Sequence, residues 1–261
     1  MPLNKVSPIP LYYQLAELIR EQVHAGDLKP GDQIPPERVL SEQHAISRMT
    51  ARQAIGYLVS ESVLVVRHGL GTFVAEPKLT RDMVTLLGFT EEMIQRGTAT
   101  SQVIAQHVTE ASGSAAEHLA LARGDAVTRL VRLRLLNGEP LLLETTLVPT
   151  ALCPGLEHED MTQQSLYSLL ERRYNLRVSR SRQTLEAVVA NEIEASYLTV
   201  ESGAPMFLLE SVTFAEDGQP VEFVKTVYRG DRFTFAFEAE RAAPQPSRPQ
   251  VAFGLRYAID H

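Results

Sequence analysis

Hydrophobic residues recur at helical spacing through the first quarter of the chain. The apolar positions of a first amphipathic helix are Leu11, Leu15, Leu18, Ile19 and Val23. A turn at residues 29–32 follows, and a short second helix opens at residues 35–38 with a proline near its first position. The pattern predicts a small unit of packed helices.

A third helix is predicted to begin after Ser47, whose hydroxyl can cap it. Its inward positions are Ala51, Ala54, Ile55 and Leu58. Arg48 and Arg52, one turn apart, project from another face with Ser47 and Thr50. Strands at 63–66 and 72–74 then form a hairpin turned by two glycines. A capped, arginine-bearing helix followed by a basic hairpin is what a winged helix-turn-helix presents to DNA.

The motifs of this region lie at residues 10–15, 26–32, 36–38, 47–50, 69 and 71–73. They resemble the DNA-binding domain of the GntR family of bacterial transcription regulators. The resemblance implies a homodimer that binds double-stranded operator DNA. The candidate DNA-contacting residues are Arg38, Ser47, Arg48, Thr50, Arg52, Arg67, His68 and Gly69.

Strand-like runs alternate with helices beyond residue 85. Helices are expected at 90–96, 114–121, 164–174 and 191–197, and strands at 101–108, 181–190, 206–214, 221–228 and 233–239, with a hairpin over 126–148. We therefore predict an α+β chain with a mostly antiparallel sheet in its second domain. The expected division is a winged helix-turn-helix at 1–75, a linker at 76–85, an effector-binding domain at 86–241 and a Pro-rich tail at 242–261.

The 126–148 hairpin carries charged residues at even positions, namely Arg132, Arg134 and Glu144, between leucines and valines. A two-residue turn at Asn137-Gly138 would place even positions opposite odd ones and break the apolar face. A three-residue loop ending in a glycine bulge would pair even with even. We therefore expect the bulged loop, with the charged residues gathered on one face.

Two arginines at this spacing form a fork for an oxyanion, phosphate above all. Helix N-termini near Phe89-Thr90 and Ser165-Tyr167 can add unpaired N–H groups. Glu222 and Tyr228 lie six residues apart on one predicted strand and therefore share a face. The pattern indicates a pocket for an anionic small molecule.

The landmarks of this second domain lie at residues 87–93, 96–97, 132–134, 138–140, 144, 165–167 and 229–232. They resemble the UTRA effector domain, which defines the HutC subfamily and has a chorismate-lyase-like fold. The implied effector-binding residues are Phe89, Thr90, Arg132, Arg134, Glu144, Ser165, Tyr167, Glu222 and Tyr228. In domains resembling the N-acetylglucosamine-utilisation repressors, the arginines and the Ser/Tyr pair hold a 6-phosphate, whereas Glu222 and Tyr228 match positions that contact sugar hydroxyls. The favoured effector is therefore N-acetylglucosamine 6-phosphate or glucosamine 6-phosphate, and the alternatives are trehalose 6-phosphate or urocanate.

The net charge of −7 over 261 residues is unusual for a DNA-binding protein. Residues 1–75 contain seven Lys/Arg and seven Asp/Glu, so the excess acid lies wholly in the second domain. Screening by salt limits the reach of this negative charge to about 8–10 Å at physiological ionic strength. A neutral DNA-binding domain predicts weak nonspecific binding, with affinity supplied by dimerisation and a specific site.

The remaining composition narrows the class of protein. One cysteine, Cys153, excludes an internal disulfide and suits a reducing cytoplasm. No 18-residue apolar run and no signal-peptide pattern is present, so we expect a cytoplasmic protein without membrane contact.

Two other classes of function are disfavoured. A lyase-like enzyme would need reactive groups, but the sequence has no Ser/His/Asp order, metal-spaced His/Cys cluster or phosphate-loop glycines. A DNA-architectural protein does not account for the size of the pocket-bearing domain. We expect no catalytic residues, cofactor or metal.

Overall fold

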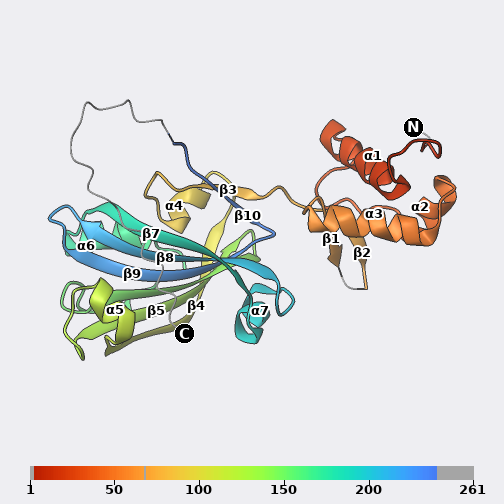
Figure 1. Ribbon diagram of the computed structural model, residues 1–261. Helices are drawn as coiled ribbons and strands as arrows, with labels where there is room; N and C mark the ends of the chain where they lie inside the picture. Colours follow the sequence, from red (N-terminus) through yellow and green to blue (C-terminus); the bar gives the residue numbers. More distant parts are fainter. Residues whose placement is uncertain (1–2, 68, 240–261) are drawn as a thin grey trace, which may run out of the picture.

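The computed structural model describes residues 3–67 and 69–239 (Figure 1). The N-terminal elements are the helices α1 (Leu11–Ala25), α2 (Glu37–Gln43) and α3 (Arg48–Ser60) and the hairpin strands β1 (Leu64–Arg67) and β2 (Gly71–Val74). His68 and the predicted tail at 242–261 lie outside the described residues. In the part that the structure describes, no helix combines the length and hydropathy needed to cross a membrane.

The predicted inward face of α3 is confirmed. Ala51, Ala54, Ile55 and Leu58 are buried in one cluster with residues of α1, α2 and both hairpin strands. The Thr50 amide donates to Ser47 Oγ at 3.0 Å, so the predicted N-cap is also present. The first turn of α3 is therefore capped and exposed, while the apolar face of the helix is buried in the domain core.

The second part of the chain is built on a six-stranded sheet in the order β4-β5-β6-β9-β8-β7, with every neighbouring pair antiparallel. Its strands are β4 (Ala99–Glu110), β5 (Ala126–Leu136), β6 (Glu139–Pro149), β7 (Val178–Val189), β8 (Pro205–Ala215) and β9 (Pro220–Arg229). The surrounding helices are α4 (Phe89–Met93), α5 (Gly113–His118), η1 (Leu156–His158), α6 (Leu166–Tyr174) and α7 (Glu192–Leu198). The expected α+β class is confirmed.

The helices divide between the two faces of this sheet (Figure 1). On one face, α4 packs on Leu142 and Tyr228, and α6 packs on Leu130. On the other face, α5 packs on Val127 and α7 packs on Leu133. The alternation of side chains along each strand therefore sends even positions of β5 toward α4 and α6.

The expected linker at 76–85 contains a strand that the sequence did not predict. Strand β3 (Leu79–Asp82) pairs in parallel with β10 (Phe233–Ala236), forming a small second sheet (Figure 1). The irregular local pattern gave no sign of it because the partner strand lies about 150 residues away in sequence. Strand β10 is also shorter than the expected 233–239.

The β5–β6 turn corrects the predicted loop. Asn137 and Gly138 have φ values of 51° and 82° and form a two-residue turn, with Leu136 opposite Glu139. The register then shifts between Arg134 and Leu135, so that Arg132 stands opposite Glu144. The bulge therefore lies in β6 beyond the turn, and it gathers the charged residues on one face as expected.

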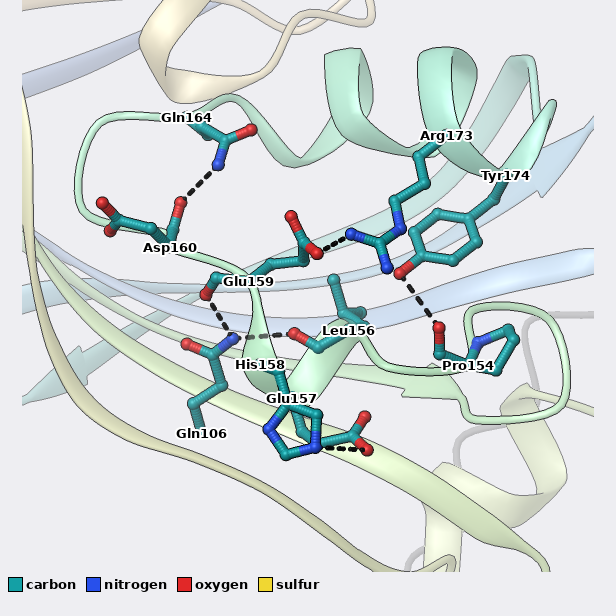
Figure 2. Close-up of polar contacts among 10 residues, drawn as sticks. All are labelled: Gln106, Pro154, Leu156, Glu157, His158, Glu159, Asp160, Gln164, Arg173 and Tyr174. Carbon is teal, nitrogen blue, oxygen red and sulfur yellow. Dashed lines mark hydrogen bonds and ion pairs between the residues drawn. The ribbon is translucent and has the colours of Figure 1, made fainter.

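Hydrogen bonds from strand and helix side chains hold the connection between β6 and α6 (Figure 2). Gln106 Nε2 on β4 donates to the carbonyl oxygens of Leu156 and Glu159, each at 2.8 Å. Tyr174 donates to the Pro154 carbonyl at 3.3 Å, and Arg173 pairs with Glu159. These contacts fix where α6 begins relative to the sheet.

Candidate functional site

The first turn of α3 forms an exposed polar surface. Ser47, Arg48 and Arg52 are exposed and Thr50 is partly exposed. Met49, which was not among the candidate residues, is 66% exposed beside them. An arginine can donate to a guanine edge, and an apolar side chain can contact a thymine methyl. This face of α3 is therefore suited to the major groove.

Two of the candidate arginines, Arg38 of α2 and Arg52 of α3, form ion pairs with glutamates of α2. Arg52 Nε lies 2.9 Å from Glu37 Oε1, and Arg38 Nη1 lies 2.9 Å from Glu42 Oε1. Exposed pairs of this kind contribute little to stability. Both guanidinium groups can therefore exchange a carboxylate for a phosphate at small cost.

The hairpin provides a second basic element. Arg67, at the end of β1, is exposed and stacks over the Phe73 ring at 4.7 Å from the centroid. Gly69 is exposed at the turn with φ of 74°. That any of these groups contacts DNA remains a prediction.

The nine candidate effector residues surround one cavity between the sheet and helices α4 and α6. They come from α4 (Phe89, Thr90), β5 (Arg132, Arg134), β6 (Glu144), the start of α6 (Ser165, Tyr167) and β9 (Glu222, Tyr228). The cavity measures about 50 Å³. That these side chains bind a ligand remains a prediction.

Arg132 forms an ion pair with Glu144 in the cavity wall. Its Nε donates to Glu144 Oε1 at 3.0 Å and its Nη2 contacts the same oxygen, while its Nη1 is buried without a hydrogen-bond partner among the described residues. Burial opposes ionisation of Glu144, but the charges of Arg132 and Arg134 outweigh it and lower the pKa of Glu144. Glu144 is therefore ionised at neutral pH.

Arg134 is a buried cation with few partners. It is 2% exposed, its Nη2 donates to Thr90 Oγ1 at 2.7 Å, and it stacks on Phe89 with 4.6 Å to the ring centroid. Its Nε has no hydrogen-bond partner within the part of the chain that the structure describes. Burial and the neighbouring Arg132 charge lower the pKa of Arg134 to about 10. An anion in the cavity would supply the missing acceptors.

Glu222 has the opposite character to Glu144. It is 4% exposed, and its Oε2 is buried without a hydrogen-bond partner in residues 3–67 and 69–239. Burial, reinforced by the Glu144 charge and opposed by Arg132, raises the pKa of Glu222 to about 8. At neutral pH it is mostly the uncharged acid, which can donate as well as accept a hydrogen bond.

We expect Glu222 to make stability fall with rising pH. The folded protein holds a proton that the unfolded chain releases near pH 4.5, so the free energy of unfolding decreases between that pH and about 8. The free energy of unfolding falls by about 1.4 kcal/mol per pH unit at most. Urea unfolding of the wild type and Glu222→Gln at pH 6, 7, 8 and 9 measures it. The free energy of unfolding of the wild type minus that of Glu222→Gln should fall with rising pH and level off above about pH 8. Parallel pH profiles of the two proteins would contradict the raised pKa of Glu222.

The N-termini of α4 and α6 are joined by a carboxylate. Glu91 accepts from Ser165 Oγ at 2.9 Å and from the Gly88 amide at 3.2 Å. Ser165 also caps α6 by accepting from the Ser168 amide. Tyr167 shares a 3.3 Å hydrogen bond with Thr213, and burial raises its pKa, so it is a neutral hydroxyl.

Sequence reasoning missed several residues that line the cavity. Ser211, Val224 and Thr226 share a face with Leu209, Glu222 and Tyr228, which strand alternation could have revealed. Arg81, on β3, also lines the cavity, contacts the Tyr228 hydroxyl and lies 3.7 Å from Glu92. No local signal marked Arg81, because its segment shows no regular hydrophobic pattern and was therefore expected to be a linker.

No grouping of three or more His, Cys, Asp or Glu side chains in the described part of the chain is arranged to hold a metal ion. The single cysteine, Cys153, is buried, and burial raises its pKa to about 12, so its thiol is protonated.

Comparison with known proteins decides the family. Residues 11–74 match the family of bacterial regulatory proteins named gntR, and residues 95–234 match the UTRA domain. This chain belongs to the GntR family. Its UTRA domain makes it a regulator of the HutC type, as the sequence motifs predicted.

Relatives of this GntR protein match over nearly their whole length. The HTH-type transcriptional repressor NagR of Bacillus subtilis is 38% identical over 242 residues, covering 92% of this chain and 99% of that protein. The mannosyl-D-glycerate transport/metabolism system repressor MngR of Escherichia coli is 32% identical, covering 89% and 97%. The crystal structure of PhnF from Mycobacterium smegmatis superposes with a TM-score of 0.62 at 30% identity, covering 87% and 99%. The chain is therefore a ligand-responsive transcriptional repressor of this family.

Proposed function

We propose that this protein is a cytoplasmic homodimeric repressor that a phosphorylated amino sugar, such as N-acetylglucosamine 6-phosphate or glucosamine 6-phosphate, releases from a palindromic operator. The observation that carries the effector class is the buried Arg132–Arg134 fork facing the start of α6. Two buried guanidinium groups and a helix N-terminus are suited to a phosphate.

The charge balance of the cavity supports an anion. Its wall contains the cations Arg81, Arg132 and Arg134, against Glu144 as the ionised carboxylate and Glu222 as a mostly protonated one. Among the wall residues cations outnumber ionised carboxylates, although Glu92 lies beside Arg81 outside the wall, and this balance favours an anionic ligand such as a phosphate monoester.

The other polar groups of the cavity favour a sugar as the remainder of the ligand. Glu144, Glu222 and Tyr228 offer acceptors and donors on the same sheet face. Burial raises the pKa of Tyr228 to about 12, so its hydroxyl stays protonated. The likeness to domains of the N-acetylglucosamine-utilisation repressors favours an amino sugar over trehalose 6-phosphate or urocanate.

We infer that effector binding enlarges the cavity. A volume of about 50 Å³ holds only a few water molecules, whereas ligand pockets usually measure about 300–1,000 Å³. Thr90 on α4 is tied to Arg134, so α4 is a wall that a ligand displaces or repositions. Movement of α4 alters the segment at residues 76–88, which leads back to the DNA-binding domain.

A dimer follows from the size of the DNA-binding surface. One charge-neutral helix-turn-helix makes few contacts, whereas two related half-sites double them. The exposed first turn of α3 would occupy the major groove in each half-site.

Thermal unfolding with sugar phosphates and their unphosphorylated parents tests the effector class. A ligand at about 100 times its dissociation constant adds roughly 2.7 kcal/mol to the free energy of unfolding. We expect stabilisation by N-acetylglucosamine 6-phosphate and none by N-acetylglucosamine at the same concentration. Equal stabilisation by both sugars would refute the phosphate fork, and consumption of the sugar phosphate would favour a lyase-like enzyme.

A further inference from the structure

Arg81 differs from the other cavity arginines in where it is anchored. Arg132 and Arg134 belong to a central strand of the large sheet, whereas Arg81 belongs to β3 in the segment between the two domains. Residues 75–78 alone separate β3 from β2, the last strand of the DNA-binding domain. A group that contacts Arg81 therefore contacts the interdomain segment itself.

The partners of Arg81 are cavity groups. Its Nη1 donates to the Tyr228 hydroxyl, and its guanidinium stacks over the Tyr228 ring with 5.4 Å to the centroid. Its Nε lies 3.7 Å from Glu92 Oε2, beyond hydrogen-bond distance, and Glu92 Oε1 is buried with no hydrogen-bond partner among the described residues. The Arg81–Glu92 contact is thus loose, and the guanidinium retains N–H groups for another acceptor.

Tyr228 connects the cavity to both strands of the small sheet. Its ring packs on Phe233 and Phe235 of β10, with centroids 4.9 and 5.2 Å apart, and its hydroxyl accepts from Arg81 of β3. A ligand group that donates to the Tyr228 oxygen competes with Arg81 for that acceptor. A ligand that accepts from Arg81 draws β3 toward the cavity.

We propose that Arg81 is a positioning residue that couples effector binding to the DNA-binding domain, because the effector takes over its hydrogen bonds and thereby repositions β3. This inference rests on the proposed function of the cavity and specifies how its occupancy reaches the operator-binding surface. Affinity for the anion comes mainly from Arg132 and Arg134. Arg81 instead makes that affinity differ between the operator-bound and the operator-free arrangement of the domains.

The test measures coupling rather than binding alone. The dissociation constant of N-acetylglucosamine 6-phosphate is determined by calorimetry with and without operator DNA, for the wild type, Arg81→Gln and Arg81→Lys. The wild type is expected to bind the sugar phosphate about tenfold or more weakly on operator DNA. In Arg81→Gln this factor should fall below about twofold, with affinity in the absence of DNA reduced by less than about tenfold. Arg81→Lys keeps the charge without the planar fork and should restore part of the coupling.

Arg96→Gln is the matched control. Arg96 also contacts β3, donating to the Thr80 carbonyl at 2.8 Å, but it is exposed and does not line the cavity. It should keep the wild-type coupling factor and operator affinity. Full coupling in Arg81→Gln, equal loss in Arg96→Gln, or loss of sugar phosphate binding by Arg81→Gln beyond about 100-fold would overturn the role of Arg81. A wild type without coupling would overturn the proposed repressor mechanism as well.

Discussion

Arg134→Met is expected to remove effector binding while changing the stability of the protein much less. Arg134 is a buried cation that has one hydrogen bond, to Thr90, and a stack on Phe89 among the described residues. Its replacement by methionine relieves the burial of a charge and the repulsion from Arg132, but it also removes one of the two cations that favour ionised Glu144, so the two effects on stability oppose each other. A phosphate would lose a buried charge-assisted hydrogen bond that contributes about 2–5 kcal/mol, so affinity should fall roughly 30-fold or more.

The measurement pairs calorimetry with N-acetylglucosamine 6-phosphate and urea unfolding in its absence. Arg129→Met is the control, because Arg129 lies on the same strand and lines a different cavity on the opposite face of the sheet. Arg134 is a better choice than Arg132, whose removal would leave the Glu144 carboxylate buried and unpaired. Retained sugar phosphate affinity in Arg134→Met would remove this residue from the effector site.

Arg48→Ala is expected to lower operator affinity while leaving effector binding unchanged. A guanidinium that reads a base contributes about 1–3 kcal/mol, and a symmetric dimer loses that amount in each half-site. The affinity of a dimer should therefore fall by at least about 25-fold. Arg48 is exposed in the first turn of α3, and its removal takes nothing from the buried cluster of that domain.

A mobility-shift titration at two salt concentrations checks this expectation. If Arg48 reads a base, Arg48→Ala should discriminate less well between the operator and a scrambled site. If Arg48 binds a phosphate instead, the variant should bind both DNAs more weakly and with a smaller salt dependence. Arg123→Ala, an exposed position in the effector domain, is the charge-matched control. Operator affinity equal to that of the control would exclude Arg48 from the DNA interface.

Short-range patterns were sufficient for much of the molecule. The spacing of Ala51, Ala54, Ile55 and Leu58 and the cap at Ser47 predicted α3 and its buried face, because helix period and capping depend on neighbours within one turn. The even spacing of Arg132, Arg134 and Glu144 likewise predicted a shared strand face, which the sheet register confirms. Family motifs then supplied the remaining members of the candidate site.

The position of the bulge in the β5–β6 hairpin could not be predicted from the sequence. The sequence indicated that even positions must face even positions, but it could not locate the extra residue. Asn137 and Gly138 both tolerate positive φ, so a tight turn forms and the bulge moves into β6. Packing of both sheet faces decided between two registers that satisfy the same alternation.

Charge states and the interdomain strand were decided by tertiary structure. Glu144 and Glu222 are the same residue type, yet the arginines beside Glu144 keep it ionised while burial keeps Glu222 protonated. Strand β3 forms because β10, about 150 residues later, supplies its backbone partners and brings Arg81 to Tyr228. The sequence by itself determined the family, the helices of the DNA-binding domain and the residues that share a strand face, since these depend on local order. Only the folded chain determined which distant groups meet and how burial sets their charge.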